Sequence, residues 1–427
     1  MFAPTLLLAL ASQTTAHAPA APSLRFPAPP GYAVSQHAGI PSGSVVATIA
    51  DDEVLVFEPT AISRVDLSQG GARTVLATFP APVYPSFAVV EPDLAHAVVG
   101  ESTNHDLLRV DLATGALAPV ANVQLNFAAV LEDPAHLLVS AATQGFFQPN
   151  DILRVPIAGG APSLVASVPG ASGPLARAAN GDLFYSPQAA TLPQPDSVTV
   201  VRWTRAQVES GAVLGLADAA TFASGFDGVA AIAVDPWTQH VFVAESRYPG
   251  VSDVHEHAAD GSFVRVAGSE PAWISSLELV RVAGAGGLEG LERAGVVMRR
   301  VASDFGLSGW PSYLETFETV RASLSATASG AATTIRVEGA EPLASVAIAS
   351  ASLASLVWPE QTTYQAPVWF HSALPASAWT GGLVVASTDA SGRAVAQLPA
   401  GSGPTVYQAL VLDALGNAVG TSAADVR

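Results

Sequence analysis

Short apolar runs separated by turn residues recur along the first two thirds of the chain. In each unit an apolar run is followed by a turn built from Asp, Asn, Pro or Gly, and then by a second apolar run. The five pairs of runs are residues 45–48 with 54–57, 87–90 with 97–99, 127–130 with 137–139, 175–178 with 183–185, and 230–234 with 241–244. The turn residues predict a β-hairpin in each unit. The near-continuous apolar character predicts strands that are covered on both faces.

A second hairpin follows each of the first ones, and an arginine recurs in it. Arg64, Arg109 and Arg154 lie 45 residues apart, and Arg202 occupies the corresponding place in the fourth unit. A repeat of this length with four strands per unit is typical of a β-propeller blade. We expect these arginines to stay exposed or to pair with a carboxylate of a neighbouring blade.

Histidines also recur within the repeat. His96, His136 and His240 each follow a first hairpin turn, which favours a structural role at the turn. In the fifth unit the sequence from His255 to His257 (HEH) replaces the arginine segment. On a strand, two histidines two residues apart share a face, and no third ligand is evident nearby, so a strand face is favoured over a zinc site.

A weaker sixth unit completes the repeat. Residues 277–280 and 295–298 are its visible strands, and residues 32–35 are expected to supply its outer strand. Pairing of the first and last blades in this way would remove free sheet edges. The prediction is a six-bladed β-propeller over residues 31–305, with five or seven blades as the alternatives.

The repeat ends after about residue 310. Residues 306–330 are expected to form a junction, in which residues 311–317 suit a short helix. Residues 331–427 contain short strand patterns and two turn sequences, residues 389–392 and 413–417, which favour a small β-sandwich. The expected fold class is therefore all-β, with a six-bladed propeller followed by a small C-terminal β-sandwich.

The N-terminus has the pattern of an export signal. The apolar run from Leu6 to Ala11 and two Ala-x-Ala cleavage patterns predict a signal peptide at residues 1–18, followed by a linker at residues 19–30. The usual basic residues before the apolar run are missing, and an apolar tail is the alternative. We expect a secreted or periplasmic, or cell-surface, protein. No other run approaches 18 apolar residues, so no transmembrane segment is predicted.

Composition excludes several function classes. The 427 residues include no Cys and no Lys, which excludes disulfides, thiolate metal ligands, and cysteine or lysine catalysis. The net charge of −18 argues against nucleic acid as a partner, because phosphate binding requires a basic surface. The chain also has no G-x-S-x-G and no H-E-x-x-H motif.

Polar residues gather in loops that a propeller would bring to one face. These are the loops that join the second and third strands of a blade and the loops that lead into the next blade. The candidate ligand-binding residues there are Glu58, Glu101, Asn104, Asn126, Asn150, Asp227 and Glu245. Carboxylate and amide oxygens suit a hard divalent cation such as Ca²⁺. A solvated rim without a ligand is the alternative, since polar loops surround every propeller.

Two segments resemble known families. The run from Phe26 to Val34 (FPAPPGYAV) with the hairpin repeats after it resembles bacterial secreted six-bladed propellers of the NHL-like and gluconolactonase-like (SMP-30-like) group. The ending from Tyr407 to Asp413 with Gly416 and Asn417 resembles a C-terminal module on secreted proteins of planctomycete-like bacteria.

The first resemblance implies a metal site. The SMP-30-like enzymes hold their ion with a Glu, two ligands of the Asn/Asp type and an Asp. The nearest residues here are Glu58 or Glu101, Asn126 and Asp227, so the candidate metal ligands are Glu101, Asn126 and Asp227.

Two functions remain open at this point. The favoured one is a non-catalytic binding or interaction module for a small molecule, a glycan or a protein, which requires no cofactor. The alternative is a lactonase or hydrolase that depends on Ca²⁺ or another divalent cation, in which the ion polarises a carbonyl group. Catalysis requires several ligands within about 2.5 Å of one point, and the spacing does not guarantee this. Oxygens converging in the central channel would favour the enzyme, whereas apolar side chains or arginines there would favour the binding module.

Overall fold

The computed structural model describes most of the repeat region and part of the C-terminal region. The described residues are 32–41, 43–50, 52–67, 71–145, 148–170, 172–187, 197–235, 239–247, 251–270, 273–282, 295–303, 312–319, 321–329, 332–338, 344–352, 384–399, 405–412, 418–422 and 425–426. The predicted signal peptide, the predicted linker and the turn at residues 413–417 lie outside them.

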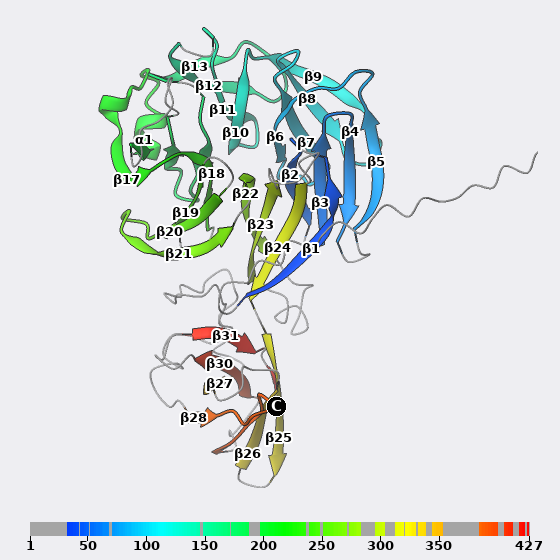
Figure 1. Cartoon of the computed structure of the whole chain (residues 1–427), viewed down its shortest axis with the longest axis vertical. Helices are drawn as coiled ribbons and strands as arrows, with labels where there is room; N and C mark the ends of the chain where they lie inside the picture. Colours follow the sequence, from blue (N-terminus) through cyan, green and yellow to red (C-terminus); the bar gives the residue numbers. More distant parts are fainter. Residues whose placement is uncertain are drawn as a thin grey trace, which may run out of the picture.

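Six four-stranded antiparallel sheets follow one another along the chain (Figure 1). Blade one contains β2 (Val45–Ala50), β3 (Glu53–Glu58), β4 (Ala61–Asp66) and β5 (Ala72–Thr78). Blade two contains β6 (Pro85–Val90), β7 (His96–Glu101), β8 (Asp106–Asp111) and β9 (Leu117–Asn122). Blade three contains β10 (Asn126–Asp133), β11 (His136–Ala141), β12 (Asn150–Pro156) and β13 (Ser163–Val168).

The remaining blades complete the ring. Blade four contains β14 (Leu175–Arg177), β15 (Leu183–Tyr185), β16 (Val198–Trp203) and β17 (Ala220–Phe226), with α1 (Arg205–Val208) and the 3-10 helix η1 (Leu216–Asp218) between the last two. Blade five contains β18 (Val229–Val234), β19 (Val241–Arg247), β20 (Val251–His257) and β21 (Phe263–Glu270). Blade six contains β22 (Trp273–Val282), β23 (Gly295–Ser303), β24 (Ser312–Thr319) and β1 (Tyr32–Ile40).

The ring is closed by pairing of its two ends. β1 pairs antiparallel with β24, with Tyr32 opposite Thr319, so the first strand is the outer strand of the last blade. The inner strands contact one another in the order β2, β6, β10, β14, β18, β22 and back to β2. The fold is therefore a closed six-bladed propeller, as the sequence predicts.

The expected helix at residues 311–317 is wrong. Ser312–Thr319 forms β24, which pairs with β23 on one side and with β1 on the other. A helix there would leave both neighbouring strands with an unpaired edge, whereas the strand satisfies their backbone groups. The expected junction at residues 306–330 thus contains β24 and β25 (Arg321–Ser329).

Blades are held together by their apolar faces. One buried cluster joins Leu55, Phe57 and Ile62 of blade one to Ala97 and Val99 of blade two. Further buried clusters span blades two and three, three and four, and four and five. Blades two, three and four are therefore covered on both faces by their neighbours, which explains their apolar runs in the sequence.

Three of the four recurring arginines pair with a carboxylate of their own blade, which corrects the expected pairing with a carboxylate of a neighbouring blade. Arg64 binds Glu53, and Arg154 binds Glu132. Arg109 likewise donates two hydrogen bonds to Glu91 in its own blade, 2.6 and 2.7 Å long. The carboxylate comes from the first hairpin of the blade because that hairpin lies beside the third strand, where the arginine is placed.

The recurring histidines lie at the hairpin turns, as expected. The Nδ1 atoms of His96 and His136 lie 2.7 and 3.1 Å from the carboxylates of Asp93 and Asp133 in their turns. His240 instead contacts Glu256, at 2.7 Å. Glu256 occupies the place that an arginine takes in the other blades.

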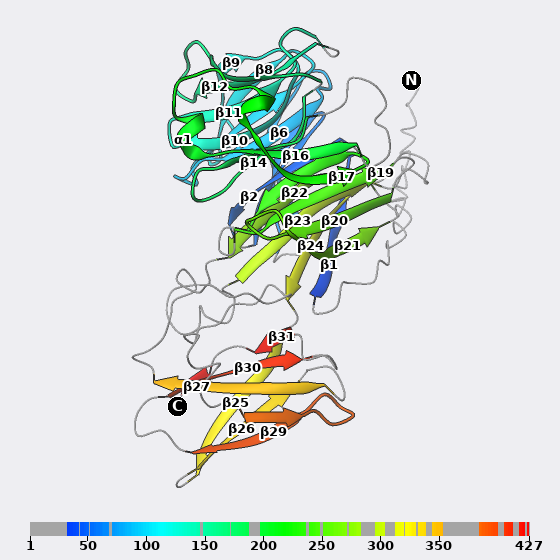
Figure 2. The same cartoon turned by 90° about the vertical axis from the view of Figure 1, so that its left-hand side faces the viewer.

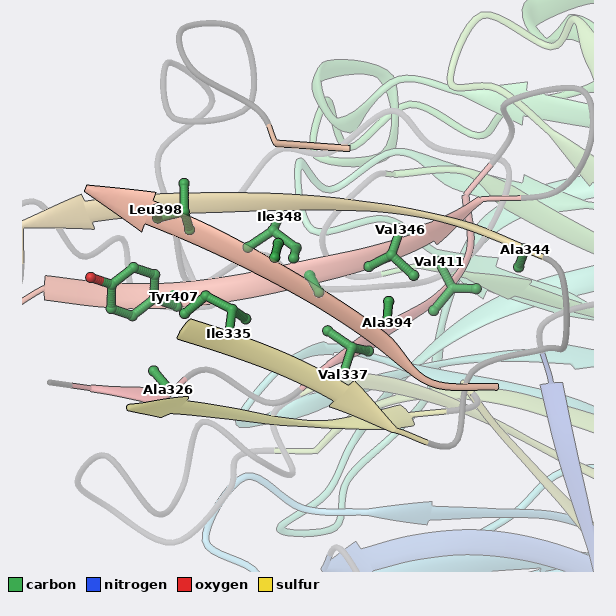
Figure 3. Close-up of a cluster of buried hydrophobic side chains, with 12 residues drawn as sticks. Ala326, Ile335, Val337, Ala344, Val346, Ile348, Ala394, Leu398, Tyr407 and Val411 are labelled. Atoms are coloured by element: carbon green, nitrogen blue, oxygen red, sulfur yellow. The ribbon is translucent and has the colours of Figure 1, made fainter. Parts of the chain in front are cut away.

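The C-terminal strands form one eight-stranded sheet (Figure 2). They are β25, β26 (Ala332–Glu338), β27 (Ser345–Ser352), β28 (Val384–Ser387), β29 (Ala394–Pro399), β30 (Thr405–Leu412), β31 (Ala418–Ser422) and β32 (Asp425–Val426). Every second residue is buried in β26 and β29, so each strand covers a core with one face. Ile335, Val346, Ile348 and Tyr407 meet in that core (Figure 3).

Candidate ligand-binding site at the channel mouth

A central channel of about 1220 Å³ runs between the six inner strands. Each inner strand pairs with a neighbour on one side only, so its other edge faces the channel. Backbone groups on these edges require a side chain, water or a ligand as partners, and the N–H of Thr48 on β2 donates to Glu278. The lining is mostly apolar with several Ser hydroxyls, and Arg177 and Glu278 are the only charged residues among the described lining residues.

One end of the channel carries a recurring irregularity. The register shifts near the start of β6, β10, β18 and β22, where one extra residue interrupts the pairing with the second strand. The extra residues are Ser86, Phe127, Ala230 and Ser275, and all four line the channel. A β-bulge re-aims the side chain of its extra residue. The bulges therefore shape this end of the channel, which we call the channel mouth.

The carboxylate of Glu101 organises the loop beside the mouth. Glu101 ends β7 and is 1% exposed. Its oxygens accept hydrogen bonds from the backbone N–H groups of Thr103 at 2.8 Å, Asn104 at 2.9 Å and Asp106 at 3.1 Å. These bonds satisfy the carboxylate within its own loop. Asn104 itself is exposed, and its carbonyl oxygen accepts a hydrogen bond from Asn122.

Asn126 lies directly beside this loop. Its Nδ2 donates to the main-chain oxygens of Glu101 at 2.8 Å and Val123 at 3.1 Å. Its Oδ1 is buried and has no hydrogen-bond partner among the described residues. A glycine makes room for it, because a Cβ atom on Gly100 would lie 2.8 Å from Oδ1. The structure therefore brings Glu101 and Asn126 together.

Blade five holds a denser charged cluster. Glu245 is 1% exposed and accepts hydrogen bonds from the backbone N–H of Asp227 and from Nη2 of Arg247, both 2.7 Å long. Arg247 also contacts Asp227 at 3.3 Å and Asp253 at 3.0 Å. The hydrogen bond with Glu245 is the main cause that raises the pKa of Arg247 above its usual value. The guanidinium thus contacts three carboxylates at once, and its single positive charge offsets part of their negative charge.

This cluster also has the groups for a metal site. Ligand atoms of Glu245, Asp253 and His255 lie within 4.8 Å of one another. The Nε2 atom of His255 is 3.1 Å from Glu245, although this contact lacks the geometry of a hydrogen bond. A cation bound here would compete with Arg247 for the same oxygens. The other such group, Glu91, Asp93 and His96, lies at a hairpin turn of blade two, where Arg109 binds Glu91.

The remaining candidate residues lie apart from these two groups. Glu58 is 5% exposed and forms an ion pair with Arg73 in its own blade. Asn150 is fully buried, and its Oδ1 accepts a long hydrogen bond, 3.5 Å, from Ser140. Neither residue lines the channel.

The candidate metal ligands come from distant parts of the ring. Glu101 and Asn126 are adjacent, but Asp227 leads into blade five and binds Arg247. Blades two and five are three places apart in a ring of six. Asp227 therefore lies across the ring from Glu101 and Asn126, and the three-residue metal site stays a prediction.

His255 and His257 share one face of β20, as expected from their spacing. Their rings lie 6.4 Å apart with an angle of 15° between the planes, and Phe226 contacts both edge-on. This arrangement matches the predicted strand face.

The sequence did not indicate that two aromatic side chains lie together at the mouth. Tyr84 is 64% exposed and Phe127 is 42% exposed, and both line the channel. Phe127 lies in a wholly apolar run, so no alternation of apolar and polar residues reveals the bulge that exposes it. The recurrence of a bulge at the same place in other blades is visible only from the pairing register.

Comparisons with known proteins assign this chain to no family. No family model matches the chain, and no curated protein matches it. Among solved structures, it is similar to the calcium-binding protein regucalcin from Agrobacterium tumefaciens, with 13% identity and a TM-score of 0.41 over 66% of this chain and 90% of that one. It is also similar to virginiamycin B lyase from Staphylococcus aureus, with 11% identity and a TM-score of 0.40 over 71% of this chain and 95% of that one.

A third similar structure, a protein of unknown function from Bacteroides thetaiotaomicron, has 10% identity and a TM-score of 0.46 over 68% of this chain and 77% of that one. At these identities and TM-scores the similarities support no inference about function. In the part of the chain that the structure describes, no helix has the length and apolar character needed to cross a bilayer.

Proposed function

We propose that the propeller is a non-catalytic binding module of an exported protein, and that its channel mouth holds a neutral small molecule. The observation that carries this proposal is the chemistry of the lining. Free strand edges and Ser hydroxyls alternate with apolar side chains, while charged side chains are rare. Such a concave site suits a ligand with both apolar surface and hydrogen-bonding groups.

The rim carboxylates support a binding role over hydrolysis. Glu58 binds Arg73, Glu101 binds its own loop, and Glu245 binds Arg247. A metal-dependent hydrolase requires carboxylate oxygens that converge on one ion and leave a position open for water or substrate. Here each of these carboxylates is bound by a residue of its own blade.

A neutral fluorescent probe tests this proposal. N-phenyl-1-naphthylamine is uncharged, and its fluorescence rises in apolar surroundings. We expect saturable binding to the full-length protein. The variant Ala230→Trp, which fills the mouth from the bulge of blade five, should bind at least about tenfold more weakly. Val75→Trp is the matched control, because Val75 is 53% exposed on the outer strand β5.

Two results would contradict the proposal. One is the absence of saturable probe binding to the unaltered protein. The other is equal binding by the Ala230→Trp variant, because the probe would then occupy another site. Circular dichroism of each variant establishes that the β-sheet content is retained.

A further inference from the structure

Two exposed aromatic rings stand at the channel mouth on adjacent blades. Tyr84 precedes β6 of blade two, and Phe127 is the bulge residue of β10 in blade three. The strands β6 and β10 contact each other along the ring. The other exposed aromatic residue among the described ones, Phe263, lies on the outer strand β21, away from the channel. The aromatic surface is thus concentrated where a ligand would enter.

The backbone beneath both rings is fixed by one loop. The N–H of Tyr84 donates to Thr103 Oγ1 at 2.8 Å, and its carbonyl oxygen accepts from Ser102 at 3.0 Å. Thr103 is in turn bound by Glu101, whose main-chain oxygen accepts from Asn126, the neighbour of Phe127. The side chain of Glu101 therefore acts as a positioning residue for Tyr84, through Thr103, whereas its link to Asn126 is made by its main chain. A platform held in this way loses little conformational entropy when a ligand binds.

The groups around the rings are hydroxyls and amides and not charges. Ser86 and Ser102 line the same cavity, and its free strand edges add N–H and C=O groups. The Ser86 Oγ atom is buried and has no hydrogen-bond partner among the described residues. Aromatic faces attract weakly polarised C–H groups because of the negative potential above the ring. The site therefore combines ring faces with neutral hydrogen-bonding groups.

We infer that the ligand is a neutral carbohydrate, which rests on the proposed function of the channel mouth. A pyranose ring has an apolar C–H face that can stack on Tyr84 or Phe127. Its hydroxyl groups both donate and accept hydrogen bonds, which matches the Ser side chains and the strand edges. The net charge of −18 and the engaged rim carboxylates do not favour an anionic sugar.

An array of neutral oligosaccharides, printed together with their uronic-acid counterparts, tests this inference on the full-length protein. We expect binding to one group of neutral oligosaccharides. Tyr84→Ala and Phe127→Ala should each weaken this binding at least about tenfold, and Tyr84→Phe should retain it. Phe263→Ala is the matched control and should bind as the unaltered protein does.

The possible results separate the two proposals. Binding of N-phenyl-1-naphthylamine without binding to any neutral oligosaccharide would overturn the carbohydrate inference alone. Absence of both would overturn the proposed function as well. Preferential binding of uronic-acid sugars, or glycan binding that survives both alanine substitutions, would also overturn the inference. Glu101→Ala adds a further readout: because its carboxylate positions Tyr84 through Thr103, this variant should lose glycan affinity while keeping the probe site.

Discussion

The guanidinium of Arg64 donates from Nη1 to the main-chain carbonyl oxygen of Leu112, which lies 3.0 Å away in the next blade. The same relationship recurs further along the ring. Arg154 donates to the carbonyl oxygen of Val208 at 3.1 Å, and Arg202 to that of Ala259 at 3.4 Å. Each arginine thereby links its own blade to the one that follows. Arg64, Arg154 and Arg202 are therefore structural residues that hold adjacent blades together.

Replacement of Arg154 by Gln should destabilise the propeller. Arg154 binds the buried carboxylate of Glu132 in addition to the carbonyl oxygen of Val208. Loss of these bonds leaves Glu132, whose side chain is 7% exposed, without its cation. We expect a loss of about 2 kcal/mol in the free energy of unfolding, measured by urea denaturation. Arg202→Gln removes the 3.4 Å hydrogen bond to the carbonyl oxygen of Ala259 and should cost less than about 1 kcal/mol. Equal losses of unfolding free energy in the two variants would contradict this explanation.

Gly100 should not tolerate a side chain. A Cβ atom at this position would lie 2.2 Å from the ring of Phe87 and 2.8 Å from Asn126 Oδ1. Gly100→Ala should therefore lower the unfolding free energy by about 1–3 kcal/mol. The control is Gly215→Ala, where φ is −125° and the nearest atom is 3.7 Å from the new Cβ, so a change within about 0.5 kcal/mol is expected. Thermal unfolding of both variants measures the difference, and similar melting temperatures would show that the interface between blades two and three adapts.

His257 should make the protein less stable in acid. Burial is the main cause that lowers the pKa of His257 below its usual 6.5, and His255 lowers it further, while Glu256 and the hydrogen bond with Gly261 oppose the shift. The unfolded chain therefore binds more protons than the folded protein below pH 6.5. Stability is fully present above that pH and falls as the pH drops below it, by at most about 1.4 kcal/mol per pH unit.

The variant His257→Phe provides the test of this pH dependence. Urea unfolding between pH 7.5 and 5, in roughly half-unit steps, should show a smaller slope for the variant than for the unaltered protein. An unchanged slope in His257→Phe would assign the acid sensitivity to another group.

Arg247 should substitute for a metal ion in blade five. Its guanidinium contacts Asp227, Glu245 and Asp253, so the unaltered protein should melt at the same temperature with calcium or with a chelator. Arg247→Ala leaves the three carboxylates without a cation and should lower the melting temperature. Because carboxylates are the preferred ligands of Ca²⁺, millimolar calcium should restore part of the loss in this variant. A chelator effect on the unaltered protein would contradict this prediction and favour a resident metal ion.

The blade architecture could be predicted from the sequence because each blade repeats the same local signals. The apolar run, the turn and the arginine strand recur every 45 residues from Arg64 to Arg154, and each signal depends on residues close in sequence. The strand at Ser312–Thr319 was not predicted because it follows a break in the 45-residue repeat, where the signals of the earlier blades are absent. Of its two partners, β23 precedes it in the chain but β1 begins at residue 32, and that second pairing depends on closure of the ring.

The candidate site was harder to predict from the sequence than the blades were, for a different reason. The roles of Glu101 and Glu245 depend on which loop N–H groups and which arginine reach them, and residue spacing does not determine this. The arginine pairing was misjudged in the same way, because Glu53 and Glu132 lie on hairpins of the same blade and not on the next blade. The exposure of Phe127 depends on a register shift that an apolar run does not reveal.

The place of β1 has a consequence for biosynthesis. Tyr32 leaves the ribosome long before Thr319, its partner in the closed ring. Blades one to five can assemble from neighbouring segments as they emerge, but the last blade must wait until the two ends meet. Contacts over such a sequence separation form slowly. Ring closure is therefore the late step of folding. A chain that ends before residue 319 leaves strand edges of the last blade unpaired, and these edges can pair with other chains.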